Sequence, residues 1–322
     1  MSNYKQLTYE QRCQIEVLNK SGMTQREIAD TVITSQPTVS RELKRNTGQR
    51  GYRHKQAQCK TKERRRNATK AVKMTDSMIA KVEQKLSEKW SPEQITGWLC
   101  DEQRESVSHE RIYQYVWEDK RAGGELYTHL RRHGKSYHKR SNGKTSRGQI
   151  RNRVGIEERP DVVDEKSRIG DWEIDTVIGK GHSGALVTIV ERATQFTLVA
   201  NVPNKSAEAV TAATIELLSP YKGALHTITA DNGKEFAYHE QLTAELGAAV
   251  YFARPYHSWE RGLNENTNGL LRQYWPKNTD FKKVAGKDVL AVVTQLNQRP
   301  RKTLGFKSPE VLMQNYMAEQ AA

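Results

Sequence analysis

Two carboxylates in the C-terminal half of the 322-residue chain are placed like residues that hold a metal ion. Asp231 directly follows a predicted strand at residues 226–230, and Glu265 lies on a predicted helix after an irregular loop. Carboxylate oxygens are the hard ligands that Mg²⁺ and Mn²⁺ prefer. Two acids on rigid elements therefore predict a metal site, and its third acid must come from an earlier strand.

The third acid is expected on the predicted strand at residues 172–178, where side chains alternate between two faces. Asp171, Glu173 and Asp175 share one face, so Glu173 is a rival ligand to Asp175. We favour Asp175, because it lies furthest along the strand. Glu173 is then expected to support a ligand or to pair with a basic side chain.

Basic and polar side chains surround these acids in the sequence. Arg261, Asn268 and Arg272 fall on the helical face of Glu265 and could hold phosphates, although a solvated helix face has the same pattern. His257 precedes that helix and could contact a phosphate of the cleaved strand or simply pack.

The elements that must position these residues follow the order βββαβαβα. Three successive strands precede any helix, which predicts a mixed sheet covered by crossover helices. This order matches a ribonuclease H-like fold, and it places Asp231 at the carboxyl end of a strand, where open α/β sheets carry their chemistry. Asp231-Asn232-Gly233 could form a hairpin turn, but the helical pattern after it argues against one. The expected ranges are strands 172–178, 185–190, 195–200, 226–230 and 249–252, and helices 206–218, 235–246, 288–299 and 308–317.

The charge of the chain is divided unevenly. The net charge is +14, yet residues 1–153 carry 33 Lys and Arg against 17 Asp and Glu, whereas residues 154–322 carry 19 against 21. A basic half of this kind attracts nucleic acid through phosphate contacts. No apolar run is long enough to span a bilayer, and three scattered cysteines indicate neither a disulfide framework nor a cysteine-rich zinc site.

Residues 7–46 predict three short helices of a helix-turn-helix. Tyr9, Cys13 and Val17 are the expected core stripe of the first helix. Thr24 with Glu27 predicts a capping box for the second helix, and Ser35 is the expected cap of the third. The third helix is expected to present polar residues to a DNA major groove, although a solvated helical bundle has the same pattern. These residues are Gln36, Thr38, Arg41, Lys44 and Arg45.

A second, weaker helix-turn-helix candidate follows a basic segment that is poor in apolar residues. Ser91 and Gln94 predict a capping box, and Ser108 caps a later helix that places His109 and Arg111 as DNA contacts. The aromatic residues of that helix could equally be core. We therefore expect an all-α helix-turn-helix domain at 1–50, a basic linker at 51–74, a second such domain at 75–133, a basic linker at 134–165, and an α/β catalytic domain at 166–322.

Three segments together resemble the catalytic core of DDE transposases and integrases, and most closely the insertion-sequence-thirty family of bacterial transposases. They are GDWEIDTVIGKG (170–181), TADNGKEF (229–236) and PYHSWERGLNENTNGLLRQYWPKNTDF (255–281). Thirty-three residues separate Asp231 from Glu265, as is typical of that family. Flanking motifs extend the likeness over nearly the whole chain, whereas Leu263 and Asn278 depart from the family pattern.

The resemblance implies a catalytic triad of Asp175, Asp231 and Glu265 that binds two Mg²⁺ or Mn²⁺ ions, with Asp175 as the bridging ligand. Two such ions stabilise the attacking and leaving oxygens of phosphodiester cleavage and transesterification. It also implies binding to double-stranded DNA, at the terminal inverted repeats of the element and at a target, and a homo-oligomer that pairs two ends. A cytoplasmic, nucleoid-associated bacterial transposase is the expected protein.

Two other functions fit parts of this pattern. A non-catalytic DNA-binding regulator with a nuclease-like fold would not require all three acids. A metal-dependent nuclease without strand transfer would not need two basic recognition domains. A transposase uses both sets of features.

Overall fold

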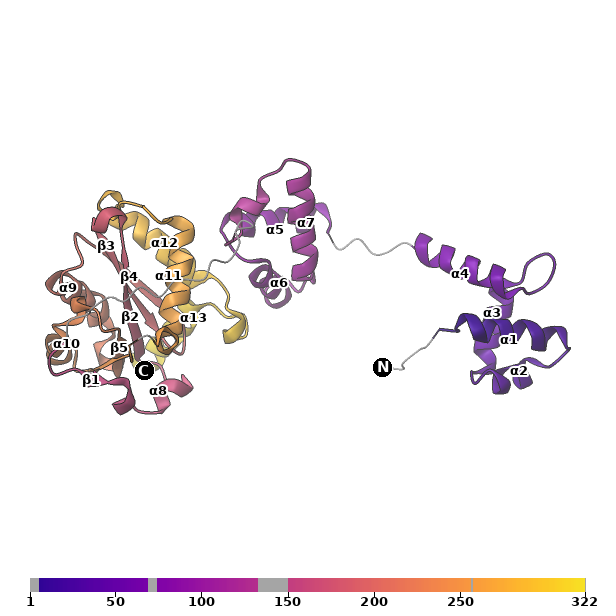
Figure 1. Ribbon diagram of the computed structural model, residues 1–322, viewed down its shortest axis with the longest axis horizontal. Helices are drawn as coiled ribbons and strands as arrows, with labels where there is room; N and C mark the ends of the chain where they lie inside the picture. Colours follow the sequence, from indigo (N-terminus) through magenta and orange to yellow (C-terminus); the bar gives the residue numbers. More distant parts are fainter. Residues whose placement is uncertain (1–5, 69–73, 133–149, 256, 322) are drawn as a thin grey trace. The chain divides into compact units, whose positions relative to one another are not determined.

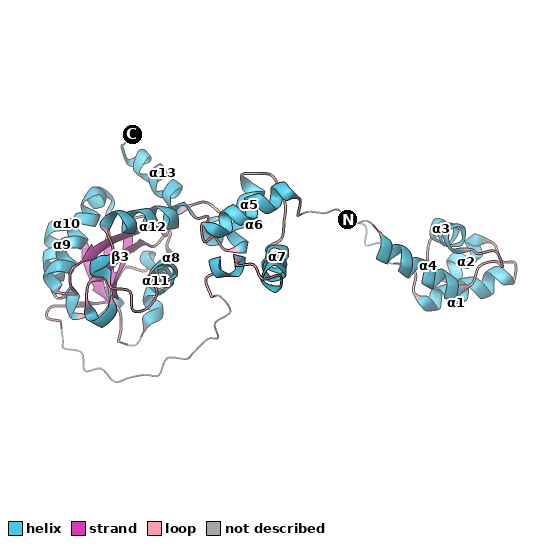
Figure 2. Cartoon of the chain, turned by 90° about the horizontal axis from the view of Figure 1, so that it is seen from above, coloured by secondary structure: helices cyan, strands magenta, loops and turns pink. Residues whose placement is uncertain are grey.

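The computed structural model describes residues 6–68, 74–132, 150–255 and 257–321. Contacts between Cα atoms divide the chain into two compact units, Met1–Val72 and Lys73–Ala322. Helices and loops make up the first unit, whereas the second also contains a sheet (Figures 1 and 2). Within the described residues, no helix is long and apolar enough to cross a membrane.

The first unit is a helix-turn-helix bundle closed by a fourth helix. Ile15, Ile28 and Val39 are fully buried at the centre of its core. Thr24 and Glu27 form the expected capping box. Ser35 occupies the N-cap position of α3, but its hydroxyl contacts the Thr38 hydroxyl at 2.8 Å instead of a backbone N–H. The helices are α1 (Tyr9–Lys20), α2 (Gln25–Thr31), α3 (Gln36–Asn46) and α4 (His54–Asn67).

The expected core stripe of α1 is wrong. Tyr9 and Val17 are 40% and 63% exposed, whereas Arg12 and Ile15 are buried. Arg12 can be buried because its Nε donates to Glu42 at 2.8 Å across the bundle, so its charge is paired away from water.

Residues 54–67, expected as part of a linker, form helix α4, which packs against α1 and α3. Few apolar residues are needed for this, because only Ala57 within the helix and Tyr52 before it are buried in the core. A hydrogen bond of 2.5 Å from Arg12 to Gln58 adds a polar contact. The sequence pattern missed this helix because most of its surface remains in water.

The second unit begins with three helices around an apolar core: α5 (Asp76–Ser87), α6 (Pro92–Asp101) and α7 (His109–Arg121). Ser91 and Gln94 form the predicted capping box of α6, and Ser108 caps α7. Tyr113 and Tyr115 of α7 are partly buried against this core, so they have the packing role that the sequence left open.

The expected linker at 134–165 is only partly described, since residues 133–149 lie outside the described residues. Its later part is folded: β1 (Val154–Gly155) pairs with the sheet, and α8 (Val162–Glu165) follows. A strand of two residues is too short to show the alternation that identifies strands in a sequence.

The sheet has six strands in the order β1-β6-β5-β2-β3-β4. Strands β2, β3 and β4 form an antiparallel meander, and β5 and β6 continue parallel to β2, as in a ribonuclease H-like fold. The predicted order βββαβαβα is confirmed, with β1 added at one edge. The further strands are β2 (Asp171–Ile178), β3 (Ala185–Glu191), β4 (Thr197–Val202), β5 (Thr227–Ala230) and β6 (Ala249–Phe252).

Helices cover both faces of this sheet (Figure 1). On one face, Trp172 and Ile174 of β2 pack with α9 (Ala207–Leu218) and α10 (His239–Leu246). On the other, Val177 of β2 packs with α11 and α12. The alternation of β2 therefore turns Asp171, Glu173 and Asp175 toward α11. The remaining helices are α11 (Gly262–Tyr274), α12 (Gly286–Gln298) and α13 (Pro309–Ala321).

Replacement of Glu42 by Ala should destabilise the first unit by about 3–5 kcal/mol, because it leaves the Arg12 charge buried and unpaired. The loss is measured as faster amide hydrogen exchange in α1 and α3 of the full chain. Asp30→Ala removes an exposed acid of α2 and should change stability by less than about 0.5 kcal/mol. Equal protection in the two variants would show that the buried pair does not hold the bundle together.

Candidate active site

Two of the three predicted acids pair with the same arginine side chain. Strands β2 and β5 are parallel neighbours, paired at Glu173 and Thr229, so Asp175 on β2 and Asp231 just after β5 lie at the same end of the sheet. Nη1 of Arg261 is 3.4 Å from Oδ1 of Asp175, and its Nη2 is 3.4 Å from Oδ2 of Asp231. One guanidinium therefore bridges two carboxylates that would otherwise repel each other.

Glu265 projects from the first turn of α11 and is exposed. Together with Asp175 and Arg261 it lines an open groove of about 780 Å³. Within the described residues, no three Asp, Glu, His or Cys side chains converge into a ready-made metal cluster. The groove thus holds Asp175 and Glu265 on facing elements, while Arg261 lies between Asp175 and Asp231.

Helix α11 is attached to the sheet through the acids of β2. Asn268 donates from Nδ2 to Oδ2 of Asp175 at 2.9 Å and accepts at Oδ1 from the Thr188 hydroxyl at 3.0 Å. One turn earlier, the backbone N–H of Asn264 donates to Oε2 of Glu173 at 3.1 Å. These bonds fix the helix that carries Glu265 relative to the strand that carries Asp175.

Glu173 is a salt-bridge partner in this structure, one of the roles expected for it. It is 1% exposed, and its Oε1 accepts from Nη1 of Arg192 at 2.6 Å. Arg192 also bonds Asp164 at 3.2 Å, which ties α8 to the same network. Asp171 is likewise occupied, because Arg168 donates to both of its oxygens, at 2.8 and 3.0 Å.

Other predicted site residues have contacts that the sequence did not suggest. Arg261 is 9% exposed and donates to the Ile174 carbonyl at 3.1 Å, so it faces the acids rather than solvent. Arg272 lines the groove and donates to the carbonyl of Ile178 at 3.0 Å. Nδ1 of His257 lies 3.3 Å from Oε1 of Glu260.

Arg131 is a groove residue that sequence reasoning missed. It follows the helical part of the second unit, donates from Nη1 to Oδ1 of Asn266 at 2.9 Å, and lines the groove beside Asp175. Asn266 lies 135 positions away in the chain, so no local pattern could have connected the two residues. Lys277 is a second basic residue of the groove that was not predicted.

The electrostatics of the site are dominated by burial. Burial raises the pKa of Asp175, the Arg261 charge opposes that rise, and the neighbouring Asp231 adds to it. Nε of Arg261 and both polar atoms of the Asn264 side chain are buried without a hydrogen-bond partner in the described structure. Unpaired buried polar groups cost stability, so these three atoms make the docking of α11 less stable.

The residues present fit divalent metal ions. Asp175 and Asp231 both contact the positive charge of Arg261, and Glu265 lines the same groove as Asp175. All three side chains offer hard oxygen donors.

The predicted DNA-contact residues of the first unit share one open side of α3. Gln36, Arg41, Lys44 and Arg45 are exposed, and Thr38 is half-buried. In the second helical part, His109 is exposed at the start of α7, whereas Arg111 pairs with Glu118 at 3.0 Å.

Two protein-family models match separate parts of this chain. An integrase core domain family matches residues 166–258, and a helix-turn-helix domain family matches residues 3–46. The transposase for insertion sequence element IS4351 of Bacteroides fragilis is 44% identical over 321 residues, covering 98% of this chain and 98% of that protein. The chain belongs to the insertion-sequence-thirty family of transposases.

Two further transposases resemble the chain over nearly its whole length. The transposase for IS30A of Escherichia coli K12 is 35% identical over 323 residues, covering 97% of this chain and 84% of that protein. The transposase for IS1086 of Cupriavidus metallidurans is 36% identical over 324 residues, covering 97% of this chain and 96% of that protein. Among solved structures, the catalytic core domain of BIV integrase is 18% identical, covers 48% of this chain and 99% of its own, and has a TM-score of 0.38.

Replacement of Arg261 by Gln should lower stability in metal-free buffer by about 2 kcal/mol, because two carboxylates lose a shared charged partner. For a unit of this size the melting temperature should fall by about 4–8 °C. Added Mg²⁺ should stabilise the variant more than the wild type, because no arginine must be displaced before the acids bind the ion.

Arg254→Gln is the matched control, since Arg254 is exposed and pairs only with Glu260 among the described acids, at 3.0 Å. Its melting temperature should change little. An Arg261→Gln protein that melts like the wild type, with the same response to Mg²⁺, would contradict the role assigned to Arg261.

Proposed function

We propose that this family member is a DDE transposase that binds the terminal inverted repeats of its insertion sequence, cuts the DNA there and joins the freed 3′-OH to a target. The observation that carries the proposal is that Asp175 on β2 and Asp231 just after the parallel neighbour β5 both contact Arg261, and that Asp175 lines a groove with Glu265. A DNA-binding unit that is separate in sequence supports it.

Asp175, Asp231 and Glu265 are the proposed ligands of two Mg²⁺ or Mn²⁺ ions. When bound, two such ions stabilise both the attacking and the leaving oxygen of a phosphoryl transfer. Asp175 is the proposed shared ligand for two reasons. It contacts the Arg261 guanidinium, which also contacts Asp231, and it accepts a hydrogen bond from Asn268 on the helix that carries Glu265. Asn268 holds the carboxylate of Asp175 in a fixed orientation.

Basic residues of the groove hold the DNA backbone in this proposal. Arg131, Arg272 and Lys277 line the groove with the acids, and their positive charge is the proposed contact for the phosphates on either side of the cut. The side of α3 with Arg41 and Arg45 is the proposed reader of the inverted repeat in the major groove. A homo-oligomer is expected, because transposition pairs two element ends.

Asp175→Asn, Asp231→Asn and Glu265→Gln should each lower the rate of cleavage of a duplex carrying the element end by about 10³-fold, because loss of a metal ligand removes several kcal/mol of charge stabilisation. Binding of the same duplex, measured in EDTA, should remain. Glu245→Gln, at an exposed acid of α10, is the control and should cut like the wild type.

Each outcome of this assay selects one function. Loss of cutting in all three variants, with joining of cut ends by the wild type, is the predicted result. Undiminished cutting by any one variant would remove that acid from the site. A wild type that binds the duplex without cutting it would be a regulator, and one that cuts without joining would be a nuclease.

A further inference from the structure

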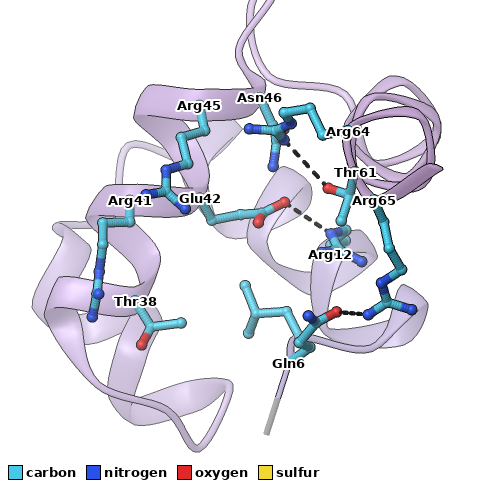
Figure 3. A pocket seen from close by; sticks show the side chains of 11 residues that line it. Gln6, Arg12, Thr38, Arg41, Glu42, Arg45, Asn46, Thr61, Arg64 and Arg65 are labelled. Carbon is cyan, nitrogen blue, oxygen red and sulfur yellow. Dashed lines mark hydrogen bonds and ion pairs between the residues drawn. The ribbon is translucent and has the colours of Figure 1, made fainter. Parts of the chain in front are cut away.

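The first unit contains a basic groove between α3 and α4. Its volume is about 350 Å³. Figure 3 shows Arg41 and Arg45 on one side, from α3, and Arg64 and Arg65 on the other, from α4. The groove therefore extends the proposed DNA-reading side of α3 onto a helix that the sequence pattern did not predict.

The acid in this groove does not neutralise those four arginines. Glu42 is the acidic residue of the lining, and it is buried against Arg12, whose Nε lies 2.8 Å away. The same oxygen of Glu42, Oε1, also accepts from the hydroxyl of Tyr52 at 3.0 Å. Within the described residues, none of the four arginines on the two walls forms an ion pair with a carboxylate.

Three of the four guanidinium groups are nevertheless held in place by neutral partners. Arg64 donates to the side-chain carbonyl of Asn46, which is 1% exposed, and Arg65 donates to that of Gln6. Arg41 donates to the Pro37 carbonyl at 3.0 Å. Neutral acceptors orient a guanidinium without cancelling its charge, so both walls keep their positive field.

Such an arrangement costs stability unless an anion enters it. Helix α4 carries six Lys and Arg against one acid, and Ala57 is its buried residue. Weak packing and mutual repulsion between facing arginines both disfavour docking of α4 on α3. Arginine has a planar fork of donors that matches phosphate oxygens, and a row of such groups beside a major-groove helix matches a DNA backbone.

We propose that the α3–α4 groove binds the phosphodiester backbone of DNA, with Arg64 and Arg65 as phosphate contacts that flank the base-reading side of α3. This inference rests on the DNA binding included in the proposed function and is independent of the catalytic site. Its ligand is the backbone of double-stranded DNA, irrespective of base sequence.

The test compares two double variants of the full chain that remove the same charge from the same helix. Arg64→Gln/Arg65→Gln neutralises the wall of the groove, whereas Lys62→Gln/Arg66→Gln neutralises two exposed residues of α4 outside its lining. Affinity for a duplex carrying the element end is measured in EDTA over a range of salt concentrations. The slope of log K against log salt should become shallower by about 1.8 for the first variant, since each phosphate contact contributes about 0.9. The control should keep the wild-type slope.

Two further measurements separate lost contacts from lost folding and from base reading. Arg64→Lys/Arg65→Lys keeps the charge and should restore most of the slope, whereas a folding defect would not depend on charge. The first variant should lose the same factor of affinity for an unrelated duplex, because phosphates carry no sequence information.

The inference fails if the two double variants give the same slope, if Arg64→Gln/Arg65→Gln binds like the wild type, or if only the element end loses affinity. A wild-type chain that binds no duplex would instead overturn the DNA-binding part of the proposed function together with this inference. If the groove variants bind the duplex like the wild type, and the wild type cuts the element end, the inference fails while the proposed function stands.

Discussion

The catalytic half of this transposase depends on holding two carboxylates close together at the end of a sheet. Asp175 lies on β2 and Asp231 directly follows the parallel neighbour β5, so the fold itself brings like charges together in a partly buried place. Arg261 offsets that repulsion with one guanidinium, 3.4 Å from each acid. The position of Arg261 requires α11 to dock on the sheet, and the Glu173 and Asn268 contacts secure that docking. In the proposed function, metal binding and protein stability therefore compete for the same two acids.

The fold could largely be predicted because its strands and helices bury apolar side chains at regular intervals. Strand β2 and helix α9 each lie within one residue of their predicted ranges, whereas β4 begins two residues later than expected. The errors occur where polar contacts replace apolar ones. The stripe Tyr9, Cys13 and Val17 is not the buried face of α1. Residues four apart drift by about 40° per step around a helix of 3.6 residues per turn, so three of them do not share one narrow face. The buried residue Arg12 has its partner Glu42 thirty positions away, and no hydrophobic pattern reveals such a pair.

In the candidate site, too, local patterns were predictable and contacts between distant residues were not. Residue types, spacing and the family resemblance predicted Asp175, Asp231 and Glu265, and that triad stays a prediction. The structure brings Asp175 and Asp231 to Arg261 and places Glu265 in one groove with Asp175, and the alternation of β2 correctly placed Glu173 on the face of Asp175. The sequence could not decide that Glu173 is paired with Arg192, because that depends on β2 and the following strands assembling. It also suggested that Arg261 contacts phosphates, whereas in the structure this residue lies between two acids. Arg131 could not be foreseen, since its place in the groove arises from contact with Asn266.

The central claim, that Asp175 is a direct ligand of the catalytic metal, is tested most directly by a change of metal preference. Asp175→Cys replaces a hard oxygen ligand by a softer thiolate, which disfavours Mg²⁺ more than Mn²⁺. The ratio of the cleavage rate in Mn²⁺ to that in Mg²⁺ should rise by at least about 10-fold over that of the wild type, with Glu245→Cys unchanged. An Asp175→Cys protein that cuts as fast as the wild type in Mg²⁺, with the same ratio, would contradict the claim.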